Sequence, residues 1–192
     1  MMASLDQQAA ESIAFIRHTM ARSASFTAVP GKGGAAMGVI GLAAAVVAAR
    51  QSDPASWLGV WLVGAALAIP IGLWTMLAKA RTHAVAMLGP AGRRFAQGFL
   101  PAIVAAGIMT ALLARSPRVD LLPSMWLLLY GAGVMAGGSA SVPVLAWTGA
   151  AFMGCGIGAG LSPAGWGDFW LGLGFGGAHI VFGLIIARKH GG

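Results

Sequence analysis

The chain has 192 residues, of which 58% are hydrophobic and only 9% are charged, and its formal net charge is +7 at pH 7. Because a soluble domain carries roughly 25% charged residues, this composition excludes a globular fold with water on all sides and favours an integral membrane protein. The positive charge is then better explained by orientation in the bilayer than by nucleic-acid binding, which we do not expect. A single cysteine, Cys155, excludes an intramolecular disulfide and a multi-cysteine metal site.

The N-terminal segment, residues 4–22, is predicted to form an amphipathic helix. Its apolar side chains recur at spacings of three and four and fall on one face: Leu5, Ala9, Ile13, Ile16 and Met20. We expect this helix to lie on the cytoplasmic surface of the membrane, where it either packs against the bundle or docks a cytoplasmic partner. The sequence has no signal-peptide pattern, so we expect the first spanning helix to direct its own insertion. Residues 1–31 thus form a helix and connector that precede a transmembrane domain at 32–192.

Long uncharged stretches predict six spanning helices, since each crossing takes about 20 helical residues. One stretch, from Leu121 to Gly167, is long enough for two crossings, and we divide it at the turn formers and proline of residues 137–143. The predicted helices cover about 32–50, 55–78, 95–114, 121–138, 142–161 and 167–187. The predicted fold is an all-α six-helix transmembrane bundle preceded by one surface helix.

The basic residues predict the orientation of this bundle. With six spans, nine Lys and Arg residues fall on one side of the membrane: Arg17, Arg22, Lys32, Lys79, Arg81, Arg93, Arg94, Arg188 and Lys189. The other side receives Arg50, Arg115 and Arg118. The positive-inside rule places the larger group, and both termini, in the cytoplasm. Such a basic face attracts the anionic headgroups of the bilayer, and it could also receive an acidic protein partner.

Three acidic residues, Asp53, Asp120 and Asp168, each lie at the predicted entry to an even-numbered helix on the other side. Aspartate is a favoured N-cap, and Asp53 is followed by proline, a favoured first helical residue. The three carboxylates could instead meet in a cation site. We favour capping, because it explains each aspartate individually without requiring the three to meet.

Glycines at four-residue spacing predict close helix contacts in the last three spans. The selected positions are Gly133 and Gly137 in the fourth helix, Gly154 and Gly158 in the fifth, and Gly172 and Gly176 in the sixth. These faces could pack within one chain or between protomers of a homo-oligomer, and the sequence does not decide between the two.

His179 is the ionisable residue most deeply placed in a predicted span, which makes it a candidate functional residue. The alternative is a structural hydrogen bond to Tyr130, Thr148 or a backbone carbonyl. A membrane haem usually needs a second axial ligand, which Met109 or Met153 could supply because the other histidines fall near the surface. We expect no cofactor and no bound metal.

The segment Gly176-Gly177-Ala178-His179 in the last helix resembles that of rhomboid-type intramembrane serine proteases. The resemblance implies a serine nucleophile in a Gly-x-Ser-Gly motif at the outer end of the fourth helix. This chain has Gly131-Ala132-Gly133 there, without the serine, and Ser139 is predicted at the cytoplasmic end, well over one helical turn from the depth of His179. A nucleophile and its base must be within hydrogen-bond reach, so the protease activity does not carry over.

These patterns favour a non-enzymatic membrane sensor, anchor or complex subunit that docks a cytoplasmic partner through residues 4–22 and the basic loop between the second and third spans. The alternative is a small transporter or channel subunit that uses His179 and the glycine-lined faces. A haem-bearing electron carrier is a third hypothesis and depends on His179 alone.

Overall fold

The computed structural model describes residues 11–13, 15, 25–82 and 86–190. It has six helices long and apolar enough to cross a membrane, as predicted. The first five spans are α2 (Gly31–Ala48), α3 (Pro54–Thr82), α4 (Pro90–Leu113), α5 (Leu122–Gly138) and α6 (Val144–Leu161). The sixth runs continuously through α7 (Gly167–Leu171), the π-helix η3 (Gly172–Ala178) and α8 (His179–His190). Short 3₁₀ turns, η1 (Val119–Leu121) and η2 (Ala164–Trp166), precede α5 and α7.

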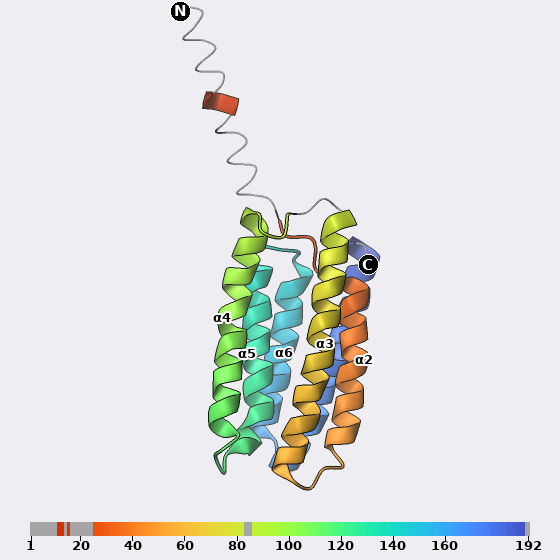
Figure 1. Cartoon of the computed structure of the whole chain (residues 1–192), viewed down its shortest axis with the longest axis vertical. Helices are drawn as coiled ribbons and strands as arrows, with labels where there is room; N and C mark the ends of the chain where they lie inside the picture. Colours follow the sequence, from red (N-terminus) through yellow and green to blue (C-terminus); the bar gives the residue numbers. More distant parts are fainter. Residues whose placement is uncertain (1–10, 14, 16–24, 83–85, 191–192) are drawn as a thin grey trace, which may run out of the picture.

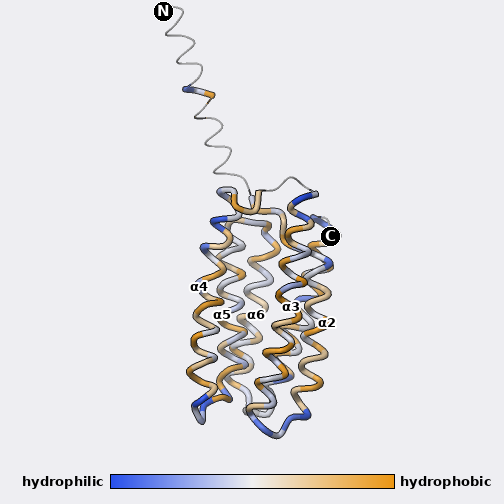
Figure 2. The backbone as a smooth tube through the Cα atoms, viewed as in Figure 1, coloured by the Kyte–Doolittle hydropathy of each residue, from blue (hydrophilic) through white to orange (hydrophobic). Residues whose placement is uncertain are grey.

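The helices run along the long axis of one bundle, with hydrophilic residues gathered at its two ends (Figures 1 and 2). This arrangement suggests a multi-pass membrane protein. The predicted break in the long uncharged stretch is confirmed, since α5 ends at Gly138 and α6 begins at Val144. Nearly all of the predicted amphipathic helix, including Arg17 and Arg22, lies outside the described residues.

Three predicted boundaries differ from the structure by more than two residues, and one of them is the end of the last span, since α8 continues to His190 rather than ending near residue 187. Helix α3 continues to Thr82 rather than ending near residue 78, and α4 begins at Pro90 rather than near residue 95. Both extensions contain basic residues, which end an uncharged stretch but do not interrupt backbone hydrogen bonding. Pro90 is also a favourable first residue of a helix because it needs no backbone donor there.

The six spans form two groups of three. Helix α5 packs between α4 and α6, whereas α2 packs between α3 and the sixth span. The groups meet mainly where the sixth span touches α5 and α6. Helices α3 and α4 are therefore peripheral: α3 packs principally on α2, and α4 principally on α5.

Glycine allows the backbones to approach closely in both groups. In one group, a Cβ added to Gly41 of α2 would lie 2.5 Å from the carbonyl oxygen of Phe175 in η3. In the other, a Cβ on Gly131 would lie 2.7 Å from the carbonyl oxygen of Gly149. Larger residues at these positions would force the helices apart.

The glycines selected from the sequence fall at different kinds of contact. Gly133 and Gly137 face α4, where an added Cβ would meet the carbonyl oxygens of Phe99 and Phe95 at 3.2 Å and 3.0 Å. Gly172 and Gly176 face Ala45 and Leu42 of α2, and Gly158 faces the ring of Trp170. A Cβ on Gly154 would meet nothing within 4 Å, so the described part of the chain shows no close helix contact at Gly154.

The connector before α2, residues 25–30, inserts into one end of the bundle. Phe26 is 1% exposed, and Ala28 and Val29 are also buried. They form a core cluster with residues of α3, α5, α6 and α8, including Ala80, Val134, Leu145 and Ile186. In Figure 1 this segment crosses the upper end of the bundle. We call this end, where α2 begins and α3 ends, the basic end, and the other the opposite end.

Candidate functional site

A polar pair inside the bundle is formed by Tyr130 of α5 and His179 of α8. The hydroxyl of Tyr130 lies 2.8 Å from His179 Nε2, and His179 Nδ1 lies 2.9 Å from the carbonyl oxygen of Phe175. Because a carbonyl oxygen can only accept, Nδ1 carries a proton. In the neutral imidazole, Nε2 then accepts the hydrogen bond that Tyr130 donates. Thr148, the other partner considered from the sequence, donates to Val144 of its own helix at 2.9 Å.

The π-helix η3 directly precedes His179 and holds the carbonyl that it contacts. η3 has the sequence GLGFGGA, and the backbone N–H of His179 donates to Gly176. The carbonyls of Phe175 and Gly176 face Gly41 and Gly38 of α2, which lack the side chains that would collide with them. Short π-helical stretches are often found at functional sites, and this one sets the position of the His179 ring.

Aromatic rings surround the polar pair. The ring of His179 lies 5.0 Å from that of Phe152 and 6.1 Å from that of Phe175, measured between centroids. Tyr130 contacts the same two rings at 4.7 Å and 5.2 Å, and Phe99 of α4 at 5.8 Å. The pair is thus held in an apolar cage, with both imidazole nitrogens already hydrogen-bonded.

Metal or haem binding at His179 would require this arrangement to change. A ligand at Nε2 would have to displace Tyr130, because Nδ1 donates to Phe175. Met153 packs against Gly131 of α5, and Met109 is 38% exposed on α4. Within the described ranges, no three His, Cys, Asp or Glu residues lie close enough together to hold a metal ion.

A second polar arrangement links the helices at the opposite end. Oδ1 of Asp168 accepts hydrogen bonds from the indole nitrogens of Trp57 and Trp61 in α3, at 2.8 Å and 3.0 Å. Trp57 stacks on Trp126 of α5 with centroids 5.7 Å apart, and the indole of Trp126 donates to Thr110 of α4 at 2.7 Å. These contacts connect the sixth span to α3 and continue across to α5 and α4.

The predicted capping role is confirmed only for Asp53. Its Oδ2 accepts from the backbone N–H of Ser56 at 2.8 Å and from the Ser56 hydroxyl at 2.9 Å. The backbone N–H of Ser56, followed by its hydroxyl, lowers the pKa of Asp53 below its usual value. The prediction is wrong for Asp168, because α7 has no side-chain cap and the carboxylate serves the two indoles instead. Indole N–H groups in an apolar surrounding need acceptors, which accounts for this use.

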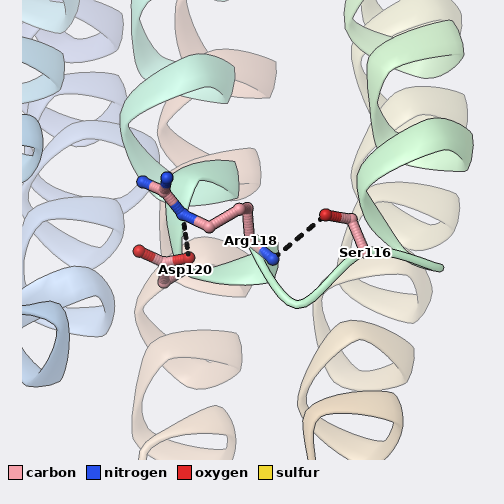
Figure 3. A network of polar contacts seen from close by, with 3 residues as sticks. All are labelled: Ser116, Arg118 and Asp120. Atoms are coloured by element: carbon pink, nitrogen blue, oxygen red, sulfur yellow. Dashed lines mark hydrogen bonds and ion pairs between the residues drawn. The ribbon is translucent and has the colours of Figure 1, made fainter.

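Asp120 also differs from the prediction. It forms an ion pair with Arg118, whose Nε lies 3.4 Å from Asp120 Oδ1 (Figure 3). The backbone N–H of Arg118 donates to the Ser116 hydroxyl at 3.1 Å, which shapes the tight turn between α4 and η1. Leu121 is the N-cap of α5, and it provides no side-chain hydrogen bond. The carboxylate of Asp120 therefore pairs with the guanidinium of Arg118 and does not cap α5 as predicted.

Six of the predicted basic-face residues are exposed at the basic end: Lys32, Arg81, Arg93, Arg94, Arg188 and Lys189. Lys79 is an exception, because its side chain is only 6% exposed and its Nζ donates to the carbonyl of Val29 at 3.0 Å. Inserting the connector buries backbone groups that need partners. Lys79 donates a hydrogen bond to one of these backbone groups, the carbonyl of Val29. Its side chain is therefore part of the core at this end and not part of the basic surface.

The insertion of the connector was not predicted from the sequence. The alternation of residues 25–28 could have indicated it, because Phe26 and Ala28 are buried and Ser25 and Thr27 are exposed. The contact of Asp168 with two tryptophans was not predicted either, although Trp57 and Trp61 are spaced to share one helix face. Comparison of the chain with family models, curated proteins and solved structures finds no match.

Proposed function

We propose that this protein is a non-enzymatic membrane subunit that presents its N-terminal segment at the basic end to an acidic partner. The observation that carries the proposal is that hydrogen bonds to the bundle hold the connector, residues 25–30, in place. Phe26 N donates to the carbonyl of Ala140 at 2.8 Å, the Ser141 hydroxyl donates to the Phe26 carbonyl, and Lys79 binds the carbonyl of Val29. A segment that precedes residue 25 is therefore joined to the bundle through a buried attachment to the loop between α5 and α6 and to α3.

The chemistry of the basic end supports the acidic nature of the partner. Six exposed Lys and Arg residues lie at the same end of the bundle as the connector. A concentration of positive charge at one end favours an acidic binding surface and makes the affinity sensitive to salt.

The interior supports a subunit over a transporter or an enzyme. His179 and Tyr130 satisfy each other inside an aromatic cage, and no buried side-chain nitrogen or oxygen of the described residues lacks a hydrogen-bond partner. A solute that bound to His179 Nε2 would have to displace Tyr130. The hydrogen-bond partners of His179 are a phenol and a carbonyl, so no serine nucleophile is activated there.

The test is affinity purification of the full chain in mild detergent, compared with a variant that lacks residues 2–22. We expect a stoichiometric soluble protein with an acidic surface that is lost from the deletion variant, is released by high salt, and is retained by His179→Ala. A wild-type preparation without such a protein would contradict the proposal. Loss of solute flux on His179→Ala in proteoliposomes, with unchanged helix content, would favour the transporter.

A further inference from the structure

The outward side of α4 carries a groove of about 700 Å³. Its lining belongs to α4 and includes Arg93, Gln97, Leu100, Pro101, Val104 and Ile108. The small side chains of Ala96 and Ala105 leave room between the larger ones. Because α4 packs principally on α5 through its other side, this groove lies on the periphery of the bundle.

The groove is chemically asymmetric along its length. Arg93 lies in the first turn of α4 at the basic end, and Gln97 follows one turn later. Beyond them the lining is apolar, and Leu100, Val104 and Ile108 are each more than half exposed. A ligand that fits this pattern has an anionic, hydrogen-bonding head and a long apolar tail.

The length of the groove fits an acyl chain. Residues 97 to 108 rise about 16 Å along the helix at 1.5 Å per residue, roughly half of the ~30 Å hydrocarbon thickness. An acyl chain of one leaflet has this reach. A guanidinium is also well suited to bind a phosphate through two hydrogen bonds.

We propose that this groove binds one anionic phospholipid of the leaflet at the basic end. The phosphate lies against Arg93 and Gln97, and one acyl chain follows Leu100, Val104 and Ile108. The site differs from general attraction to a basic face because it requires one arginine at the entrance to one groove. Arg94, the next residue, has the same charge and lies at the same end but does not line the groove, so it offers a matched control.

The experiment is native mass spectrometry of the full chain, purified in detergent and exposed to equal amounts of phosphatidylglycerol and phosphatidylcholine. We expect one phosphatidylglycerol to be retained in preference to phosphatidylcholine. Arg93→Gln should weaken that retention about tenfold, as expected for loss of a charge-assisted hydrogen bond, and Arg94→Gln should leave it unchanged. Ala105→Phe, which fills the groove and keeps the charge, should also remove the lipid.

Circular dichroism checks that each variant keeps its helix content, and several results would overturn the proposal. Equal retention of the two lipids would show no preference for the anionic head. Equal weakening by Arg93→Gln and Arg94→Gln would indicate a general charge effect. A dimer that Ala105→Phe converts to a monomer, without retained lipid, would mean that a second copy covers the groove.

Discussion

The two ends of the bundle are closed by different means. At the basic end, a piece of main chain enters the core, with Phe26 and Ala28 almost fully buried. At the opposite end, a side chain links the helices, since one oxygen of Asp168 accepts hydrogen bonds from both Trp57 and Trp61. Main chain introduces N–H and C=O groups that must each find a partner. The first closure therefore needs Ala140, Ser141 and Lys79, whereas the second needs a single carboxylate.

The difference has a functional consequence. The main-chain closure joins the bundle to the segment that precedes it through the buried contacts of residues 26–29. The side-chain closure joins helices only to one another. The proposed partner binds at the basic end. Substitutions in the connector should therefore affect both stability and partner binding, whereas substitution of Asp168 should affect stability alone.

The largest expected effect is that of Phe26→Ala. Removing this buried ring should lower the free energy of unfolding by about 3–5 kcal/mol, because the surrounding core can close over the cavity only in part. Unfolding in mixed detergent micelles would measure it. Phe169→Ala at the opposite end is the control, since Phe169 is 54% exposed, and equal losses from the two variants would contradict the buried connector.

Asp168→Ala should have the next largest effect, a loss of about 2–3 kcal/mol in the free energy of unfolding, because it leaves two indole N–H groups without an acceptor. Asp168→Asn keeps an oxygen that can accept and should lose much less. The change should also appear in tryptophan fluorescence. If the two variants behaved alike, the hydrogen bonds to Trp57 and Trp61 would not be the reason for the loss.

Lys79→Met tests how the connector is held. We expect it to lower the free energy of unfolding by about 1–2 kcal/mol, because the buried carbonyl of Val29 loses a charged donor. Lys32→Met, at an exposed position of the same end, should change it by less than about 0.5 kcal/mol. Cleavage of the connector by protease should become faster only in the first variant, and equal rates would contradict the role of Lys79.

The smallest expected effect is the pH dependence of the Asp53 cap. Because its pKa is lowered in the folded state, the cap contributes stability above the usual carboxyl pKa and loses it as the pH falls through the lowered value. Wild-type protein should therefore lose slightly more stability than Asp53→Ala between about pH 5 and pH 2. Parallel thermal unfolding curves for the two proteins across this range would contradict the capping contribution.

Much of the fold followed from local features of the sequence. The six spans and the break at residues 139–143 were predictable because a membrane helix needs a long apolar run and because Gly, Ser and Pro interrupt it. The Asp53 cap was predictable because its partner, Ser56, is three residues away. A contact within one helical turn needs only the right spacing along the chain, which the sequence displays directly.

Asp120 departed from its predicted role through a neighbour two residues away, Arg118, but the other failed predictions of polar contacts involve partners far apart in the chain. Asp168 binds tryptophans more than 100 residues away, and Lys79 binds a carbonyl 50 residues away. The sequence placed His179 at depth but left its partner open among three candidates, and only the packing of α5 against the sixth span brought Tyr130 to it. The same holds for the groove on α4, which exists because that helix contacts α5 on one side and leaves the other uncovered.

By itself, the sequence determined that the chain is an all-helical protein with six helices long and apolar enough to span a membrane, because apolar length and helix-breaking residues are read along the chain. The tertiary structure decided which polar groups lie inside and what they contact. In an apolar interior each such group must meet a partner, and the nearest partner in space is set by how the helices pack rather than by distance along the sequence.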